Sequence, residues 1–246
     1  MQVGRNFYKK IMALSLGMLA LDFPYGRADT FLVGVENIEY MPHFSVVGEE
    51  YAGFARELLD TYARDRGHHF RYKPLPIKRL NIELMEGRID FKYPDNPAWR
   101  GRDVSKLHFS APVFEYVEGA NVPPELYGSA LGSLAIIRGF TPVPYLDRID
   151  RGDLELSEHN SLRAALRFVL LGRTDAIYGE RHVVQYYLRH MMGRPGKLVF
   201  DDTRPLVRDY YHLSSAIRPE ALEDFSRWLE ENRQKIAVLK NSFGLN

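Results

Sequence analysis

The chain contains no cysteine among its 246 residues. This absence excludes disulfide bonds, a thiolate nucleophile and zinc sites built on cysteine. It also excludes a lipid anchor on a cysteine that follows an export signal. We therefore expect a fold that is held together by its core alone and a protein that is not tethered to a membrane through a thiol.

The sequence also lacks an excess of charge of either sign. It has 33 Lys and Arg residues against 32 Asp and Glu residues, which gives a formal net charge of +1. Removal of residues 1–28 changes this charge to about −2. Such a near-neutral surface gives no electrostatic reason to expect nucleic acid or an anionic membrane as a partner.

Long hydrophobic runs are missing as well. The main apolar run, Ile11–Leu21, is too short for a membrane-spanning helix, which needs roughly 20 apolar residues. The positive Lys9 and Lys10 precede it, and Gly26 and Ala28 place small residues at the −3 and −1 positions of a cleavage site. We therefore predict that residues 1–28 are a cleavable signal peptide and that the mature protein is periplasmic.

Sequence motifs of catalysis are not present either. There is no G-x-S-x-G, no H-E-x-x-H, no phosphate-binding P-loop and no dinucleotide fingerprint. The eight histidines lack the close spacing of a metal site, and the adjacent His68 and His69 would face opposite sides of a strand. We therefore expect no cofactor, no metal site and no enzymatic activity.

The first ninety residues alternate between strand and helix patterns. Apolar, β-branched residues predict a strand at 31–35, and 3–4 spacing of apolar residues predicts a helix at 52–66. A strand at 69–73, a helix at 77–85 and a strand at 89–91 follow. This alternation predicts a parallel sheet with helices on its faces.

The middle of the chain interrupts this alternation before it restarts. Residues 92–102 are rich in Pro, Gly and charge, which predicts a loop, and 109–118 predicts an extended segment. The later predicted elements are strands at 134–137, 154–156, 176–178 and 197–200, helices at 161–171 and 181–191, an extended segment at 209–217 and helical chain from 219 to 243. We therefore expect two α/β units joined by extended segments.

Seven short motifs follow one another along the mature chain. They are Tyr40-Met41-Pro42-His43-Phe44, Gly53-Phe54, Glu57-Leu58-Leu59, Glu86-Gly87-Arg88-Ile89-Asp90, Phe109-Ser110-Ala111-Pro112, Arg138-Gly139-Phe140-Thr141 and Gly172-Arg173-Thr174-Asp175-Ala176. Each motif alone is weak, but their common order is specific. In these motifs and their order the sequence resembles the family 3 extracellular solute-binding proteins over nearly all of the mature chain.

The resemblance implies the type II periplasmic binding fold, an α/β architecture of two lobes joined by two crossing strands. Lobe 1 would comprise residues 29–114 plus 207–246, and lobe 2 residues 115–206. A small-molecule ligand would bind in the cleft between the lobes, which a hinge closes. The implied partner of this monomer is an ABC permease of the amino-acid type, or a membrane receptor if the protein is a sensor. A third hypothesis is an enzyme similar to cyclohexadienyl dehydratase, which has the same fold.

The resemblance also suggests where a ligand carboxylate would bind. Family members use an Arg after the third strand, because a guanidinium can donate two parallel hydrogen bonds to a carboxylate. Counted from Asp90, Arg102 has the family spacing, while counting back from Phe109 leaves Arg100 in competition. Trp99 replaces a carboxylate-binding Thr; it would stack on the ligand or pack as part of its loop.

Four further residues are candidates for the ligand site. Glu180 replaces the Asp that holds the ligand ammonium in the family, or is an acid favoured by the helix dipole at the start of the next helix. Thr141 would bind an anion or cap a helix. Tyr40 and Phe44 would form an aromatic wall of the cleft or belong to the core.

Overall fold

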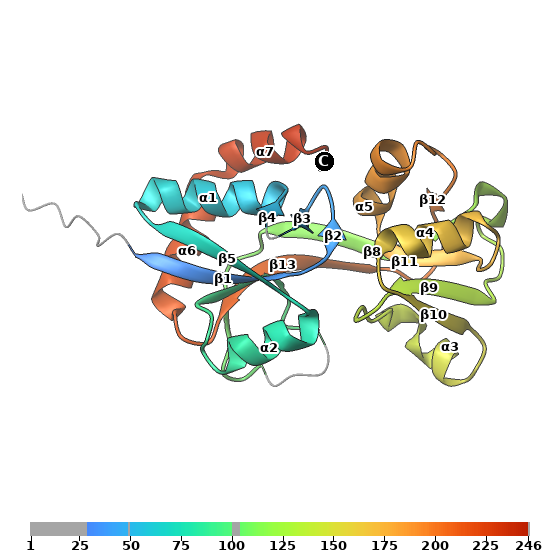
Figure 1. Cartoon of the computed structure of the whole chain (residues 1–246), viewed down its shortest axis with the longest axis horizontal. Helices are drawn as coiled ribbons and strands as arrows, with labels where there is room; N and C mark the ends of the chain where they lie inside the picture. Colours follow the sequence, from blue (N-terminus) through green and yellow to red (C-terminus); the bar gives the residue numbers. More distant parts are fainter. Residues whose placement is uncertain (1–28, 49, 100–103, 246) are drawn as a thin grey trace, which may run out of the picture.

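The computed structural model describes residues 29–48, 50–99 and 104–245, and these form a mixed α/β architecture of two lobes, as predicted (Figure 1). The predicted signal peptide, residues 1–28, and both Arg100 and Arg102 lie outside this part of the chain. Over the described ranges, no helix has the length and apolar character needed to cross a membrane.

The first lobe begins with the predicted alternation of strands and helices. Its elements are β1 (Thr30–Glu36), α1 (Phe54–Arg66), β5 (His69–Leu75), α2 (Ile77–Met85) and β6 (Phe91–Asp95). Strand β1 pairs in parallel with both β5 and β6. Helix α1 ends where Gly67 takes a φ of +71°, a left-handed conformation that glycine adopts without a steric penalty.

A small antiparallel sheet lies between β1 and α1, where the sequence predicted neither a strand nor a helix. It consists of β2 (Glu39–Tyr40), β3 (Phe44–Val47) and β4 (Glu50–Ala52). Strands of two to four residues are too short to show an alternating pattern, which explains why the sequence did not reveal them. The connection between β2 and β3 carries His43.

Strand β6 extends further than the sequence indicated. Residues 92–95 belong to this buried strand, so the loop predicted from residue 92 is wrong for these positions. The charges of Lys92 and Asp95 suggested a solvated loop, but both side chains are fully buried and paired with each other. The pairing allows two charged residues to lie inside a sheet.

Two long strands connect the lobes. Strands β8 (Phe114–Val122) and β13 (Val207–Ser215) pair antiparallel to each other. Strand β13 pairs with β6 and with the short β7 (His108–Phe109), while β8 pairs with β11 of the second lobe. The sheet order is β10-β9-β11-β8-β13-β6-β1-β5, and Figure 1 shows β8 and β13 running from one lobe to the other.

The second lobe repeats the arrangement of strands and helices around β9, which pairs in parallel with β10 and β11. Its elements are β9 (Ser133–Ile137), α3 (Leu146–Asp150), β10 (Glu155–His159), α4 (Leu162–Leu170), β11 (Ala176–Glu180), α5 (Arg181–Tyr186) and β12 (Val199–Phe200). Ser161 caps α4 by accepting the Ala164 N–H at 3.2 Å. The helix predicted at 181–191 changes at Tyr187 to a π-helical turn.

The C-terminal segment returns to the first lobe as two helices, α6 (Pro219–Glu231) and α7 (Arg233–Ser242). One continuous helical segment was predicted, but the helix is interrupted at Asn232. The Trp228 indole donates to Asp65 at 2.9 Å, and the Tyr62 hydroxyl to Asp224 at 3.1 Å. These bonds fix α6 against α1, beside which Figure 1 also shows α7. The residue boundaries of the lobes stay a prediction.

Candidate functional site

The end of β11 and the start of α5 place a carboxylate at the junction of the two lobes. Glu180 is the N-cap of α5, and its Oε2 accepts the backbone N–H groups of His182 at 2.7 Å and of Val183 at 2.9 Å. An acceptor at this position satisfies amides that have no partner within the helix. The carboxylate is therefore held in one orientation by the backbone.

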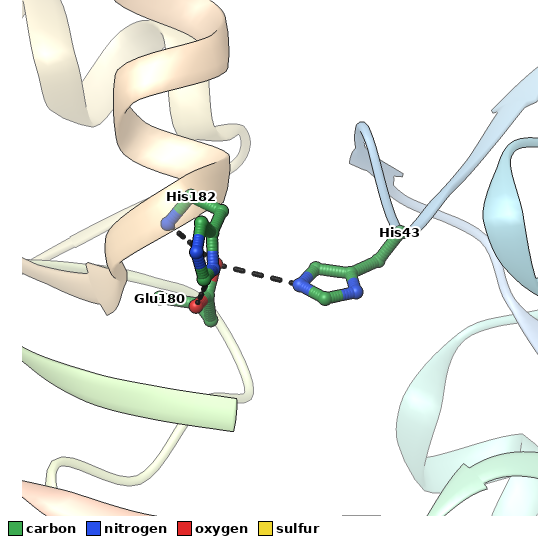
Figure 2. Close-up of side chains that lie close together, drawn as sticks. All are labelled: His43, Glu180 and His182. Atoms are coloured by element: carbon green, nitrogen blue, oxygen red, sulfur yellow. Dashed lines mark hydrogen bonds and ion pairs between the residues drawn. The ribbon is translucent and has the colours of Figure 1, made fainter. Parts of the chain in front are cut away.

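Two histidines complete a group that we call the junction triad, His43, Glu180 and His182 (Figure 2). The His182 Nδ1 lies 2.8 Å from Glu180 Oε1, and the His43 Nε2 lies 3.4 Å from Oε2. Because an ionised carboxylate only accepts hydrogen bonds, both ring nitrogens carry the proton. Burial opposes ionisation of Glu180, but hydrogen bonds from His182 and His43 outweigh it and lower its pKa to about 2.

His43 reaches the triad from the first lobe. Its ring meets Phe114 edge-on at a centroid distance of 4.4 Å and Tyr211 at 5.7 Å. Gly53 allows the start of α1 to approach the backbone here, because a Cβ at this position would lie 2.8 Å from the Phe44 Cα. The His43 side chain is 2% exposed, and its Nδ1 has no hydrogen-bond partner among the described residues.

Tyr40 makes a second contact between the lobes. Its hydroxyl accepts the backbone N–H of Glu180 at 3.2 Å. Its ring packs between Phe44 at 5.5 Å and Phe140 at 5.4 Å. The structure therefore brings together three of the residues singled out from the sequence, Tyr40, Phe44 and Glu180. Phe44 is buried in the core behind Tyr40.

A second carboxyl group lies directly across the sheet from Glu180. Glu118 of β8 is its cross-strand partner, and like charges opposite each other in a sheet are unfavourable. Burial and the charge of Glu180 raise the pKa of Glu118 to about 8. At neutral pH Glu118 is therefore mainly protonated, and the junction carries a single carboxylate charge from this pair.

A separate ionic group, which we call the Lys92 pair, lies inside the first lobe. The Lys92 Nζ is 3.1 Å from Asp95 Oδ1 and donates to Asn81 Oδ1 at 2.8 Å. The Ser214 hydroxyl donates to the other oxygen of Asp95. Lys92 also lies over the Trp99 ring at 5.1 Å, so a cation of the protein itself already occupies a face of this indole.

Tyr211 of β13 connects the two groups. Its ring stacks on Tyr116 at 4.4 Å and meets both His43 at 5.7 Å and Trp99 at 6.3 Å. The Trp99 indole donates to the Tyr116 hydroxyl at 3.3 Å. Trp99 is thus packed beside the crossing strands, and an aromatic layer separates it from the junction triad.

Other predicted residues fall elsewhere. Thr141 is exposed, although its neighbour Phe140 contacts Tyr40; the 3₁₀ turn that follows begins at Val143 and is not capped by a side chain. Sequence reasoning missed His43, His182 and Glu118. His43 and Glu180 are 137 residues apart, so no spacing rule could join them. The Glu-x-His pattern at the start of α5 was the one available signal.

The chain is similar to known proteins in its structure, whereas comparisons of its sequence find no match. The sequence matches no protein-family model, and a search of curated proteins finds no match. A histidine kinase sensor domain similar to periplasmic binding proteins superimposes with a TM-score of 0.71 at 19% identity, covering 88% of this chain and 96% of its own. An ancestral arginine-binding protein bound to arginine superimposes with a TM-score of 0.67 at 17% identity, covering 87% of this chain and 97% of its own.

The substrate-binding protein of an amino acid ABC transporter also superimposes, with a TM-score of 0.67 at 18% identity, over 87% of this chain and 98% of that one. These similarities span both lobes and the crossing strands. The chain therefore has the type II periplasmic binding protein fold that the sequence motifs predicted.

Proposed function

We propose that the protein binds a small polar solute, amino-acid-like or a small carboxylate, between its two lobes. The observation that carries this proposal is the meeting of both lobes at one buried carboxylate. His43 and Tyr40 come from the first lobe and contact the side chain and the backbone of Glu180 in the second. A solute that takes part in these contacts favours the closed form over the open one.

The residues at the junction suggest how the solute is held. Glu180 attracts a cationic group of the solute, which takes the place of the long bond from His43. Tyr40 provides an aromatic wall with Phe44 behind it, and Trp99 packs against the site from the far side of Tyr211. Arg102, with Arg100 as the competitor, binds a carboxylate, and Thr141 binds at the rim.

We further propose that the protein acts in the periplasm, after removal of residues 1–28, as a freely diffusing monomer. A membrane ABC permease is the partner that this role requires. A receptor is the alternative, since a sensor domain and a transporter component superimpose about equally well. Uptake of the identified solute is measured in cells that lack the gene. Loss of uptake supports the role in transport, and unchanged uptake supports the role in sensing.

One observation favours a second candidate function, acid/base catalysis. The cross-strand partners Glu118 and Glu180 have pKa values of about 8 and about 2. Such a split is how a pair of carboxyl groups provides an acid and a base at the same pH. Incubation of the bound solute with the protein, followed by mass spectrometry, tests this candidate, since a binding protein returns the solute unchanged.

The solute is identified by a thermal-shift screen of amino acids, polyamines and small carboxylates in the presence of EDTA, because a ligand raises the melting temperature. Calorimetry then compares variants. Glu180→Gln and Arg102→Ala should each lose about 10- to 100-fold in affinity, the cost of a charge-assisted hydrogen bond. Glu155→Gln, at an exposed position of the second lobe, and Arg233→Ala, at an exposed position of the first lobe, are the matched controls, and Arg100→Ala tests the competing arginine. Wild-type affinity in both test variants would refute the site.

A further inference from the structure

The junction triad has the donor set of a transition-metal site. One ligand atom from each of His43, Glu180 and His182 lies within 4.8 Å of the other two. Imidazole nitrogen suits Zn²⁺, Ni²⁺ and Cu²⁺, whereas sites for Mg²⁺ and Ca²⁺ use oxygen alone. Two histidines and one carboxylate are a known zinc ligand set, and they leave one position of a tetrahedral ion open.

One distance in the junction triad fits two ligands of an ion better than it fits a hydrogen bond. The 3.4 Å between His43 Nε2 and Glu180 Oε2 is long for an N–H···O bond. Two ligands of a tetrahedral zinc ion, with bonds of about 2.1 Å, are about 3.4 Å apart. The 2.8 Å between His182 Nδ1 and Oε1 needs only a small rotation of a side chain that is 20% exposed.

The surroundings of the triad support the same interpretation. His43 is buried, its Nδ1 has no hydrogen-bond partner in the described chain, and its Nε2 makes one long bond. Because the only hydrogen bond that Nε2 makes among the described residues is this long one, that nitrogen lacks a strong partner, and an ion would supply it. The backbone amides of His182 and Val183 fix the carboxylate, as outer partners of metal ligands do.

We propose that His43, Glu180 and His182 bind a divalent transition-metal ion, Zn²⁺ foremost, which links the two lobes. Because His43 belongs to the first lobe and the other two ligands to the second, the ion stabilises the closed arrangement. This site goes beyond the proposed solute binding, since it needs no organic ligand. The ion and a cationic group of the solute would both bind Glu180, so they compete for this carboxylate.

The test uses the full chain without a polyhistidine tag, treated with EDTA and dialysed. Zinc chloride is titrated by calorimetry, and Co²⁺ is used as a spectroscopic probe, because its visible bands report a tetrahedral site. We expect one equivalent of Zn²⁺ to bind and to raise the melting temperature. His43→Gln and His182→Gln should each weaken binding by more than about 100-fold, beyond the cost of losing an outer partner.

His190→Gln is the matched control, since this histidine is exposed on the second lobe and should leave zinc binding unchanged. Circular dichroism checks each fold, and His182→Gln remains informative if the buried His43 position does not tolerate glutamine. Absence of zinc binding by the wild type, or equal binding by the His182 variant, would overturn the proposal. A solute that still binds in EDTA would then leave the proposed function standing, which separates the two outcomes.

Discussion

The Lys92 pair and the junction triad are both buried groups of charged side chains, but they are assembled differently. Lys92 and Asp95 are three residues apart on one strand, and their partners Asn81 and Ser214 belong to the same lobe. The triad joins a short loop of the first lobe to the beginning of a helix in the second.

This difference leads us to expect a structural role for the Lys92 pair and a functional role for the junction triad. In the solute binding proposed above, opening of the lobes leaves the Lys92 pair intact, because the pair, Asn81 and Ser214 all belong to the first lobe. The same proposed motion would separate His43 from Glu180, so the triad would exchange partners when a ligand binds. Variants of the first group should therefore change the stability of the fold, and variants of the second group the balance between open and closed forms.

The largest expected effect concerns the Lys92 pair. Lys92→Met keeps the length of the side chain but removes the ammonium group that lies 3.1 Å from the buried Asp95 carboxylate. Loss of one member of a buried pair costs about 3–5 kcal/mol, to be measured by urea unfolding. Arg138→Met breaks the exposed Arg138–Glu158 pair and should cost less than about 1 kcal/mol. Equal losses in the two variants would remove the distinction between buried and exposed pairs.

Glu36, at the end of β1, should produce a pH dependence of folding. Burial raises its pKa from 4.5 to about 7, which the charge of Lys92 partly opposes. The folded state keeps this proton between pH 4.5 and 7 while the unfolded state loses it, so stability falls across this interval by about 3 kcal/mol. Glu36→Gln removes this loss and should be more stable than wild type at pH 8, with the advantage disappearing by pH 4.

Urea unfolding at several pH values gives this difference directly, and other titrating groups cancel between wild type and variant. Glu50→Gln, at an exposed position of β4, is the control. A difference between wild type and Glu36→Gln that does not change with pH would contradict the raised pKa.

The contrast between the two groups also explains what the sequence could predict. Helix α2 was expected at its observed residues, 77–85, because Pro76 precedes it and Gly87 follows within one turn. Such signals lie within a few residues of the element that they define. The Lys92 pair is equally local, but charge was interpreted as exposure, and only the pairing inside the lobe reveals the strand.

The candidate site was predictable where one segment sufficed and not where two segments meet. Glu180 was found from its place after a strand, and Tyr40 from its motif. His43 lay in that same motif without any signal of a role, because its partner is 137 residues away. Glu118 required the register of β8 against β11, which depends on how the crossing strands pair.

The smallest expected effect is the most specific to the contact between lobes. Tyr40→Phe removes the hydroxyl that accepts the Glu180 N–H, and Tyr62→Phe removes a hydroxyl that donates to Asp224 within the first lobe. Both changes delete the hydrogen bonding of one buried hydroxyl, worth about 1 kcal/mol. The Tyr62 variant should lose this amount in urea unfolding with no change of shape. The Tyr40 variant should instead show a larger radius of gyration by small-angle X-ray scattering, because its lost bond held the lobes together. Equal radii for the two variants would mean that Tyr40 belongs to the core rather than to the contact that opens.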